Sequence, residues 1–265
     1  METSEQLRKR LERVQQSAEE DDVNNSCCEQ VSRWMQNKAY QLFAYTIWDS
    51  LISGFKPGRM RAIELMDVKP TDKVLLIGEG TGLDFECLPS NINKRTLKAF
   101  DFSPEMVRQS KMKAKQFGIP EENCFVGDAQ KMPFKDEKFD KILFPLSLAS
   151  VPNPKLALSE AERVLEPGGM IVIFEKMVDD EATISWGRSA ANVLAKCTFA
   201  DINRNLSDMM GKETSPLKIT HYESLENKQT GLLAGQLGYY YRVAVLTRKE
   251  DYPDQPAIPA KLHAM

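Results

Sequence analysis

The feature that most constrains the fold is a short apolar run that leads directly into three alternating glycines. Lys73–Ile77 has the composition of a buried strand, and Gly78, Gly80 and Gly82 follow it at every second position. Glycine accepts positive φ and lets the backbone approach a ligand closely, because it has no Cβ. A strand, a glycine turn and a following helix predict a ligand site at the carboxyl end of the strand, although a plain tight turn would use the same glycines.

Further strand patterns alternate with helical patterns along the chain. The apolar runs are Leu97–Asp101, Cys124–Val126, Lys141–Phe144 and Met170–Phe174. A helix is predicted from about Pro154 to Leu165, ending at the turn Glu166–Gly169. This alternation predicts an α/β fold with a doubly wound, mostly parallel sheet. Two later β-like runs, 217–222 and 239–247, predict an antiparallel addition near the C-terminal edge.

The flanking segments differ in composition from this core. Residues 1–30 are rich in charge, and we expect either a solvated lead helix or a helix that contacts a membrane surface or a partner. Residues 31–66 are aromatic and helical in pattern and predict a cap over the core at 67–250. The prolines in 251–265 predict an unstructured tail.

Composition excludes several classes of function. The net charge is −3, so the chain lacks the global positive field expected of a nucleic-acid binder. No apolar stretch reaches the roughly 18 to 20 residues that span a bilayer, and the charged N-terminus is unlike a secretory signal, so a soluble, cytoplasmic protein is expected. Five cysteines and two histidines, without paired C-x-x-C spacing, predict neither a disulfide framework nor a metal site.

Two acidic residues follow the second and third predicted strands. Asp101 is placed to accept hydrogen bonds from both hydroxyls of an adenosine ribose, and Phe102 beside it can lie against the adenine. Asp128, in the sequence Gly127-Asp128-Ala129, supplies a carboxylate that is placed to accept from the adenine amine. Each aspartate is also compatible with a turn role, and Ser103-Pro104 predicts a helix cap with proline at its first position.

The glycine spacing separates the possible nucleotide cofactors. Dinucleotide-binding folds use G-x-G-x-x-G, whereas residues 78–82 read G-x-G-x-G. No Gly-Lys-Ser/Thr follows the loop, which argues against a nucleoside triphosphatase. A nicotinamide oxidoreductase is therefore the weaker interpretation.

Five ordered motifs over about residues 70–175 resemble the class I S-adenosylmethionine-dependent methyltransferases, which have a Rossmann-like fold. The motifs are Val74–Gly82, Phe100–Met106, Gly127–Phe134, Phe139-Asp140 and Arg163–Gly169. Looser matches at 47–59 and 150–154 are similar to bacterial phosphatidylethanolamine N-methyltransferases, within a small-molecule and lipid branch that includes quinone C-methyltransferases.

The resemblance implies a role for each matching position in holding S-adenosyl-L-methionine. Glycines 78, 80 and 82 would approach the methionine and ribose parts, Asp101 would bind the ribose, and Phe102, Asp128 and Ala129 would surround the adenine. Tyr40, Tyr45 or Trp48 of the cap would close over the sulfonium, unless these rings only pack the cap.

One position departs from the family pattern. The family usually carries Asp or Glu two residues before the first glycine, where this chain has Leu76. Three consequences are open: weaker cofactor binding, compensation by Glu79 inside the loop, or a methyltransferase fold without efficient catalysis.

The predicted acceptor side is poor in catalytic groups. Residues 145–149, after the fourth strand, hold no Asp or His, so we expect in-line methyl transfer to a small-molecule or lipid-like acceptor that needs little base assistance. Ser147 and Tyr45 are the acceptor-side candidates, although Ser147 is also compatible with an ordinary loop hydroxyl. Glu175-Lys176, at the end of the fifth strand, is either a polar contact for the acceptor or an exposed pair. The alternative hypothesis is a non-catalytic binding or scaffold protein on the same fold.

Overall fold

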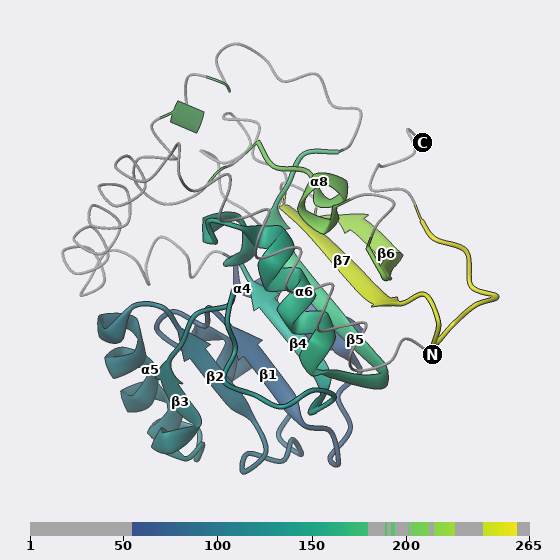
Figure 1. Ribbon diagram of the computed structural model, residues 1–265. Coiled ribbons are helices and arrows are strands. Elements are labelled where there is room, and N and C mark those ends of the chain that lie inside the picture. Colours follow the sequence, from purple (N-terminus) through teal and green to yellow (C-terminus); the bar gives the residue numbers. More distant parts are fainter. Residues whose placement is uncertain are drawn as a thin grey trace.

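The part of the chain that the structure describes forms one mixed sheet flanked by helices (Figure 1). The computed structural model describes residues 55–179, 189, 192–193, 201, 203–211, 215–225 and 241–258. The strands are β1 (Val74–Ile77), β2 (Lys98–Asp101), β3 (Cys124–Val126), β4 (Phe139–Pro145), β5 (Leu165–Lys176), β6 (Leu217–Ser224) and β7 (Tyr241–Arg248). The α-helices are α4 (Lys56–Met66), α5 (Pro104–Gln116), α6 (Pro154–Val164) and α8 (Leu206–Met210). Short 3-10 turns lie at Leu83–Cys87 (η1), Glu121–Asn123 (η2) and Leu148–Ser150 (η3).

The strand order is β3-β2-β1-β4-β5-β7-β6, and the first five strands are parallel. β7 runs antiparallel to both β5 and β6, which confirms the predicted pair near the C-terminal edge. The chain moves outward from β1 to β2 and β3, and then returns to place β4 on the other side of β1. In open α/β sheets, ligands bind beside the carboxyl ends of the strands at such a switch of direction.

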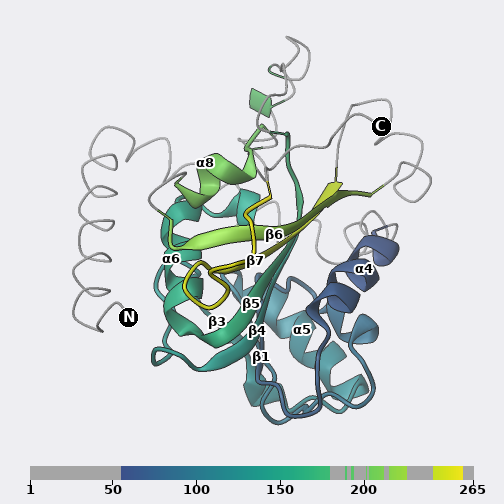
Figure 2. The same cartoon turned by 90° about the vertical axis from the view of Figure 1, so that its right-hand side faces the viewer.

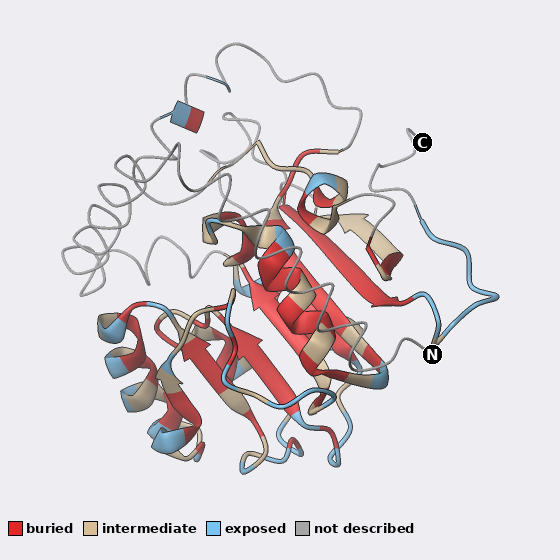
Figure 3. Cartoon of the chain, viewed as in Figure 1, coloured by how far each residue is buried: buried red, intermediate tan, exposed pale blue. Residues whose placement is uncertain are grey.

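Helices cover both faces of the sheet (Figure 2). One buried cluster joins α6 and α8 to side chains such as Leu75, Phe144 and Ile173, and the other joins α4 and α5 to Leu76 and Val172. Successive strand residues therefore serve opposite cores, which explains why the central strands are apolar on both faces (Figure 3). Residues 55–66, which contain α4, are the described part of the predicted cap, and 31–54 and 1–30 lie outside the described residues.

The predicted start of the fifth strand was wrong. β5 begins at Leu165, immediately after α6, and includes the residues expected to form a turn. The pairing shifts from Phe139–Leu165 to Lys141–Met170, so 166–169 form a bulge within the strand. Gly169 is required there because a Cβ would lie 2.8 Å from the carbonyl oxygen of Asp140.

The expected unstructured tail is attached to the sheet in its described part, 251–258. The amide of Ile258 donates to the carbonyl oxygen of Ile219 at 2.8 Å, and the ammonium of Lys218 donates to the carbonyl oxygens of Tyr252 and Gln255. These contacts engage the outer strand β6. Such contacts cover an edge strand and so protect it from pairing with another chain. The prolines in 251–265 do not indicate these contacts.

Arg248 links the end of β7 to the junction between α6 and β5. Its buried Nη2 donates to the carbonyl oxygens of Glu162 at 2.8 Å and Leu165 at 2.6 Å. Arg248→Met should lower the free energy of unfolding by about 2–4 kcal/mol, because two buried carbonyls lose a charged donor. Urea titration measures this loss.

Arg108→Met is the matched control on α5, where the side chain is half exposed and pairs with Glu105. It should change the unfolding free energy by less than about 0.5 kcal/mol. Equal effects of the two substitutions would contradict the proposed link.

Candidate functional site

The glycine loop after β1 adopts the backbone expected of it. Gly78, Gly80 and Gly82 have φ of 70°, 59° and 81°. A Cβ on Gly78 would lie 2.4 Å from the Cβ of Ser147, whereas a Cβ on Gly80 would meet nothing within 4 Å. Gly78 is thus required by a close approach of two loops, while the space over Gly80 is open to a ligand.

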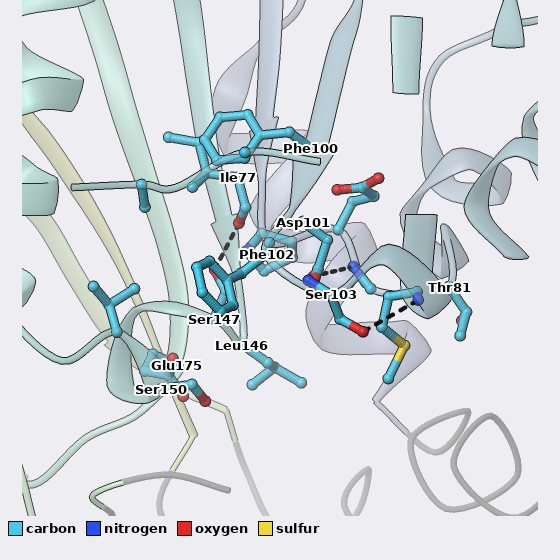
Figure 4. A pocket seen from close by; sticks show the side chains of 18 of the residues that line it. Ile77, Thr81, Phe100, Asp101, Phe102, Ser103, Leu146, Ser147, Ser150 and Glu175 are labelled. Carbon is cyan, nitrogen blue, oxygen red and sulfur yellow. Dashed lines mark hydrogen bonds between the residues drawn. The ribbon is translucent and has the colours of Figure 1, made fainter. Parts of the chain in front are cut away.

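Asp101 holds this loop from the neighbouring strand. Ile77 pairs with Phe100 in the parallel register, so the loop and Asp101 leave the sheet side by side. Oδ2 of Asp101 accepts from the amide of Gly80 at 3.0 Å, and Oδ1 accepts from the amide of Ser103 at 2.8 Å (Figure 4). Burial raises the pKa of this carboxyl, and the backbone donors oppose that shift.

Asp101 therefore takes the turn role, and because it also lines the cavity its role toward a ligand stays a prediction. Ser103 caps α5, with its Oγ accepting from the amide of Met106 at 3.5 Å, and Pro104 begins the helix as predicted. The cap leaves the carboxylate of Asp101 facing the cavity described next, because a carboxylate oxygen can accept more than one hydrogen bond.

A cavity lies at the carboxyl ends of β1, β2, β4 and β5. Several site residues that the sequence predicts line this cavity: Gly78, Glu79, Gly80, Asp101, Phe102, Asp128, Ala129 and Ser147. Figure 4 shows Asp101 and Phe102 on one side and Ser150 and Glu175 on the other. Gly82 is not among the lining residues; it ends the loop against the ring of Phe85. Tyr40, Tyr45 and Trp48 lie outside the described residues.

At the predicted adenine end, Phe102 is 51% exposed, so its ring is available to a ligand. Asp128 also makes a turn contact, because its Oδ1 accepts from the amide of Gln130 at 2.8 Å. The assignment of both residues to an adenine remains a prediction, and their shared position on the cavity agrees with it.

The position of Glu79 in the glycine loop suggests contact with a ligand, but its carboxyl group contacts α5. Oε1 accepts from the hydroxyl of Ser110 on α5 at 2.9 Å, and Oε2 is buried without a hydrogen-bond partner. Burial raises the pKa of Glu79 well above its ordinary range, and the nearby charge of Asp101 adds to this. Leu76 is fully buried in the cluster beneath α4 and does not line the cavity.

The opposite wall of the cavity is formed by the segment after β4 and the end of β5. The hydroxyl of Ser147 donates to the carbonyl oxygen of Ile77 at 2.6 Å, so this predicted acceptor-side residue joins the β4 loop to β1. Leu146, before it, has a φ of 58°, a strained value for leucine. The two loops are therefore held tightly together beside the cavity.

Glu175 and Lys176 both line this wall. The oxygens of Glu175 accept from the amides of Ala149 at 2.9 Å and Lys176 at 2.8 Å. Burial lowers the pKa of the Lys176 ammonium, whose nitrogen lies 5.8 Å from the centre of the Tyr241 ring. The pair is thus not the fully exposed pair that was one of its two interpretations.

Sequence reasoning did not identify Phe55, Arg59 or Leu146 as lining residues. Arg59 stands on a face of α4 that also carries Ala62, Ile63 and Met66, all buried. An arginine in such an apolar stripe is the signal that would have found it.

The comparisons with known proteins agree with this geometry. Residues 75–173 match the family model described as "Methyltransferase domain". The fold, the cavity and this match agree with the resemblance of residues 75–173 to the class I, S-adenosylmethionine-dependent methyltransferases.

Two of the similar proteins are named as methyltransferases of a quinone. The chain is 32% identical over 134 residues to a demethylmenaquinone methyltransferase of Bacillus cytotoxicus, covering 49% of this chain and 56% of the relative. It is 30% identical over 134 residues to the protein of that name in Bacillus cereus, with the same coverage. The matches thus span little more than half of these relatives.

Solved structures share the fold at low identity. One is a geranyl diphosphate methyltransferase in complex with SAM, with a TM-score of 0.57 and 16% identity, over 72% of this chain and 85% of that one. Another is a Haloferax volcanii putative methyltransferase in complex with the Trm112 activator, with a TM-score of 0.59 and 18% identity, over 78% and 96%.

The open space over Gly80 generates a test of the site. Gly80→Ala should lower the affinity for S-adenosylhomocysteine at least 10-fold in calorimetric titration, because the new methyl group occupies ligand space. Its backbone strain, about 1–2 kcal/mol, should leave the protein folded. Gly168→Ala is matched, with a φ of 76° and nothing within 4 Å, but it lies outside the cavity. Equal affinities of the two variants would refute this placement.

The buried Glu79 generates a pH prediction. A carboxyl whose pKa is raised by folding favours the folded state at low pH, and this contribution is lost as the pH rises from the ordinary glutamate range toward the raised pKa. Glu79→Gln keeps an acceptor for Ser110 without the charge. The unfolding free energy of the variant relative to wild type should therefore increase between mildly acidic and neutral buffer. A difference that is constant with pH would be inconsistent with a raised pKa.

Proposed function

We propose that the protein transfers a methyl group from S-adenosylmethionine to a small, apolar or lipid-like acceptor. The observation that carries this proposal is the pairing of open space over Gly80 with the carboxylate of Asp101 in one cavity. A ligand with an adjacent pair of hydroxyls and an elongated chain fits this arrangement, since the hydroxyls would reach Asp101 while the chain passes over the glycines.

Each residue has a defined task in this proposal. Asp101 accepts from the ribose hydroxyls, and Gly78 and Gly80 admit the methionine part at backbone distance. Phe102 and Asp128 flank the adenine. The cofactor, when bound, supplies a methyl group on a sulfonium that is already activated toward attack. The protein has only to align an acceptor in line with that bond and to exclude water.

The acceptor class is inferred from the far wall of the cavity. Phe55, Pro145, Leu146, Val151 and Pro152 give it an apolar surface. Two of the polar groups there are already engaged, since Ser147 donates to Ile77 and Glu175 accepts two amides. An apolar acceptor, such as the demethylmenaquinone that the Bacillus relatives are named for, suits this surface better than a highly charged one.

A second candidate function rests on Leu76. Its burial in the core leaves no acid at the position where the family usually has one. A protein that binds the cofactor but uses the domain as a scaffold would have the same structure. Methyl transfer to any acceptor would remove this candidate.

Calorimetric titration with S-adenosylmethionine and S-adenosylhomocysteine tests the cofactor claim. Asp101→Ala should weaken both affinities by roughly 10- to 100-fold, the effect of losing charged hydrogen bonds to two hydroxyls. Asp67→Ala, at an exposed residue paired with Lys69, is the control and should bind as wild type does. Absence of binding by the wild-type protein would overturn the proposal.

Turnover is measured with cofactor labelled in its methyl group. A demethylmenaquinol and a phosphatidylethanolamine serve as acceptors in separate reactions. Label should enter the organic phase with wild type and not with Gly80→Ala. Cofactor binding without transfer to either acceptor would favour the scaffold candidate.

A further inference from the structure

Arg59 and Asp84 form a buried ion pair beside the cavity. Nη1 of Arg59 donates to Oδ2 of Asp84 at 2.5 Å, and the two side chains are 6% and 0% exposed. Arg59 lines the cavity from α4, and Asp84 lies in η1, directly after the glycine loop. The pair therefore joins α4 to the segment that follows the glycine loop.

The hydrogen bonding of this pair is incomplete. Nε of Arg59 and Oδ1 of Asp84 are both buried without a hydrogen-bond partner. A guanidinium has five N–H donors in a planar fork that matches a carboxylate in two-point contact. A buried cation with unused donors on a cavity wall is suited to an anionic group of a ligand.

The position of the Arg59–Asp84 pair on the cavity wall indicates which anionic group of a bound cofactor would lie near Arg59. Asp101, Phe102 and Asp128 line the end proposed for the adenosine, so the methionine part of a bound cofactor would extend toward α4 and the β4 loop. That part carries one anionic group, its α-carboxylate. Leu76 provides no charge there, and Glu79 is bonded to Ser110. Arg59 is the charged side chain from α4 that reaches the cavity among the described residues.

We propose that Arg59, oriented by Asp84, binds the α-carboxylate of the cofactor's methionine part. Recognition at this end thus relies on a cation that reads the carboxylate, where the family pattern relies on an acid at position 76. This inference rests on the proposed function and deepens it, because it explains how the chain holds the methionine part with leucine at that position.

Two ligands distinguish carboxylate binding by Arg59 from a purely structural role of this side chain. S-adenosylhomocysteine carries the amino acid, whereas 5′-methylthioadenosine has the same adenosyl thioether without it. Arg59→Gln in the full chain should weaken S-adenosylhomocysteine by roughly 10- to 100-fold in calorimetric titration and leave 5′-methylthioadenosine within about twofold of wild type. Arg61→Gln is the control on the same helix, where Arg61 pairs with Glu64 and Glu223 outside the cavity, and it should change neither affinity.

Arg59→Gln leaves the buried Asp84 without its counter-ion, so a second variant guards against unfolding. Arg59→Gln combined with Asp84→Asn removes both charges and should show the same selective loss. Equal weakening of the two ligands in the double variant would overturn the inference, as would unchanged S-adenosylhomocysteine affinity with a raised KM for the acceptor. Failure of wild type to bind either ligand would instead overturn the proposed function on which the inference rests.

Discussion

The site depends on one interaction, the acceptance of two backbone amides by the carboxylate of Asp101. One amide belongs to Gly80 in the loop after β1, and the other belongs to Ser103 at the start of α5. Because β1 and β2 are parallel neighbours, their ends are adjacent, and a single side chain fastens both connections. These hydrogen bonds hold the glycine loop in its positive-φ conformation, which leaves open space above Gly80.

Other buried carboxyl groups hold the remaining loops in the same manner. Glu79 attaches the glycine loop to α5 through Ser110, Asp84 attaches η1 to α4 through Arg59, and Glu175 accepts the amide of Ala149 in η3. Burial raises the pKa of each of these three groups. Such contacts cost desolvation energy, and their concentration around one cavity marks the region where shape is held most tightly.

Much of the fold was predictable because the parallel sheet is buried on both faces. Continuous apolar runs, a glycine turn and the Ser103-Pro104 cap are local signals, and they placed the strands and Asp101 correctly. The start of β5 at Leu165 was missed because a bulge with glycines has the composition of a turn. The attachment of 251–258 depends on contacts with β6 that are distant in sequence.

The candidate site was predictable where it follows strand ends and unpredictable where it depends on side-chain direction. Glu79 has a position in the loop that suggests ligand contact, yet its carboxyl packs against α5. Ser147 was a candidate for the acceptor, yet it donates to Ile77. The role of Arg59 as a lining residue follows from the packing of α4, which places this side chain on the cavity.

The central claim is that the carboxyl ends of β1 and β2 hold the adenosyl end of the cofactor. A crystal structure of the full chain with S-adenosylhomocysteine tests it most directly. The ribose hydroxyls should lie within hydrogen-bond distance of the Asp101 carboxylate, with the thioether chain over Gly80. Electron density for the ligand at another place, or with the ribose turned away from Asp101, would contradict it.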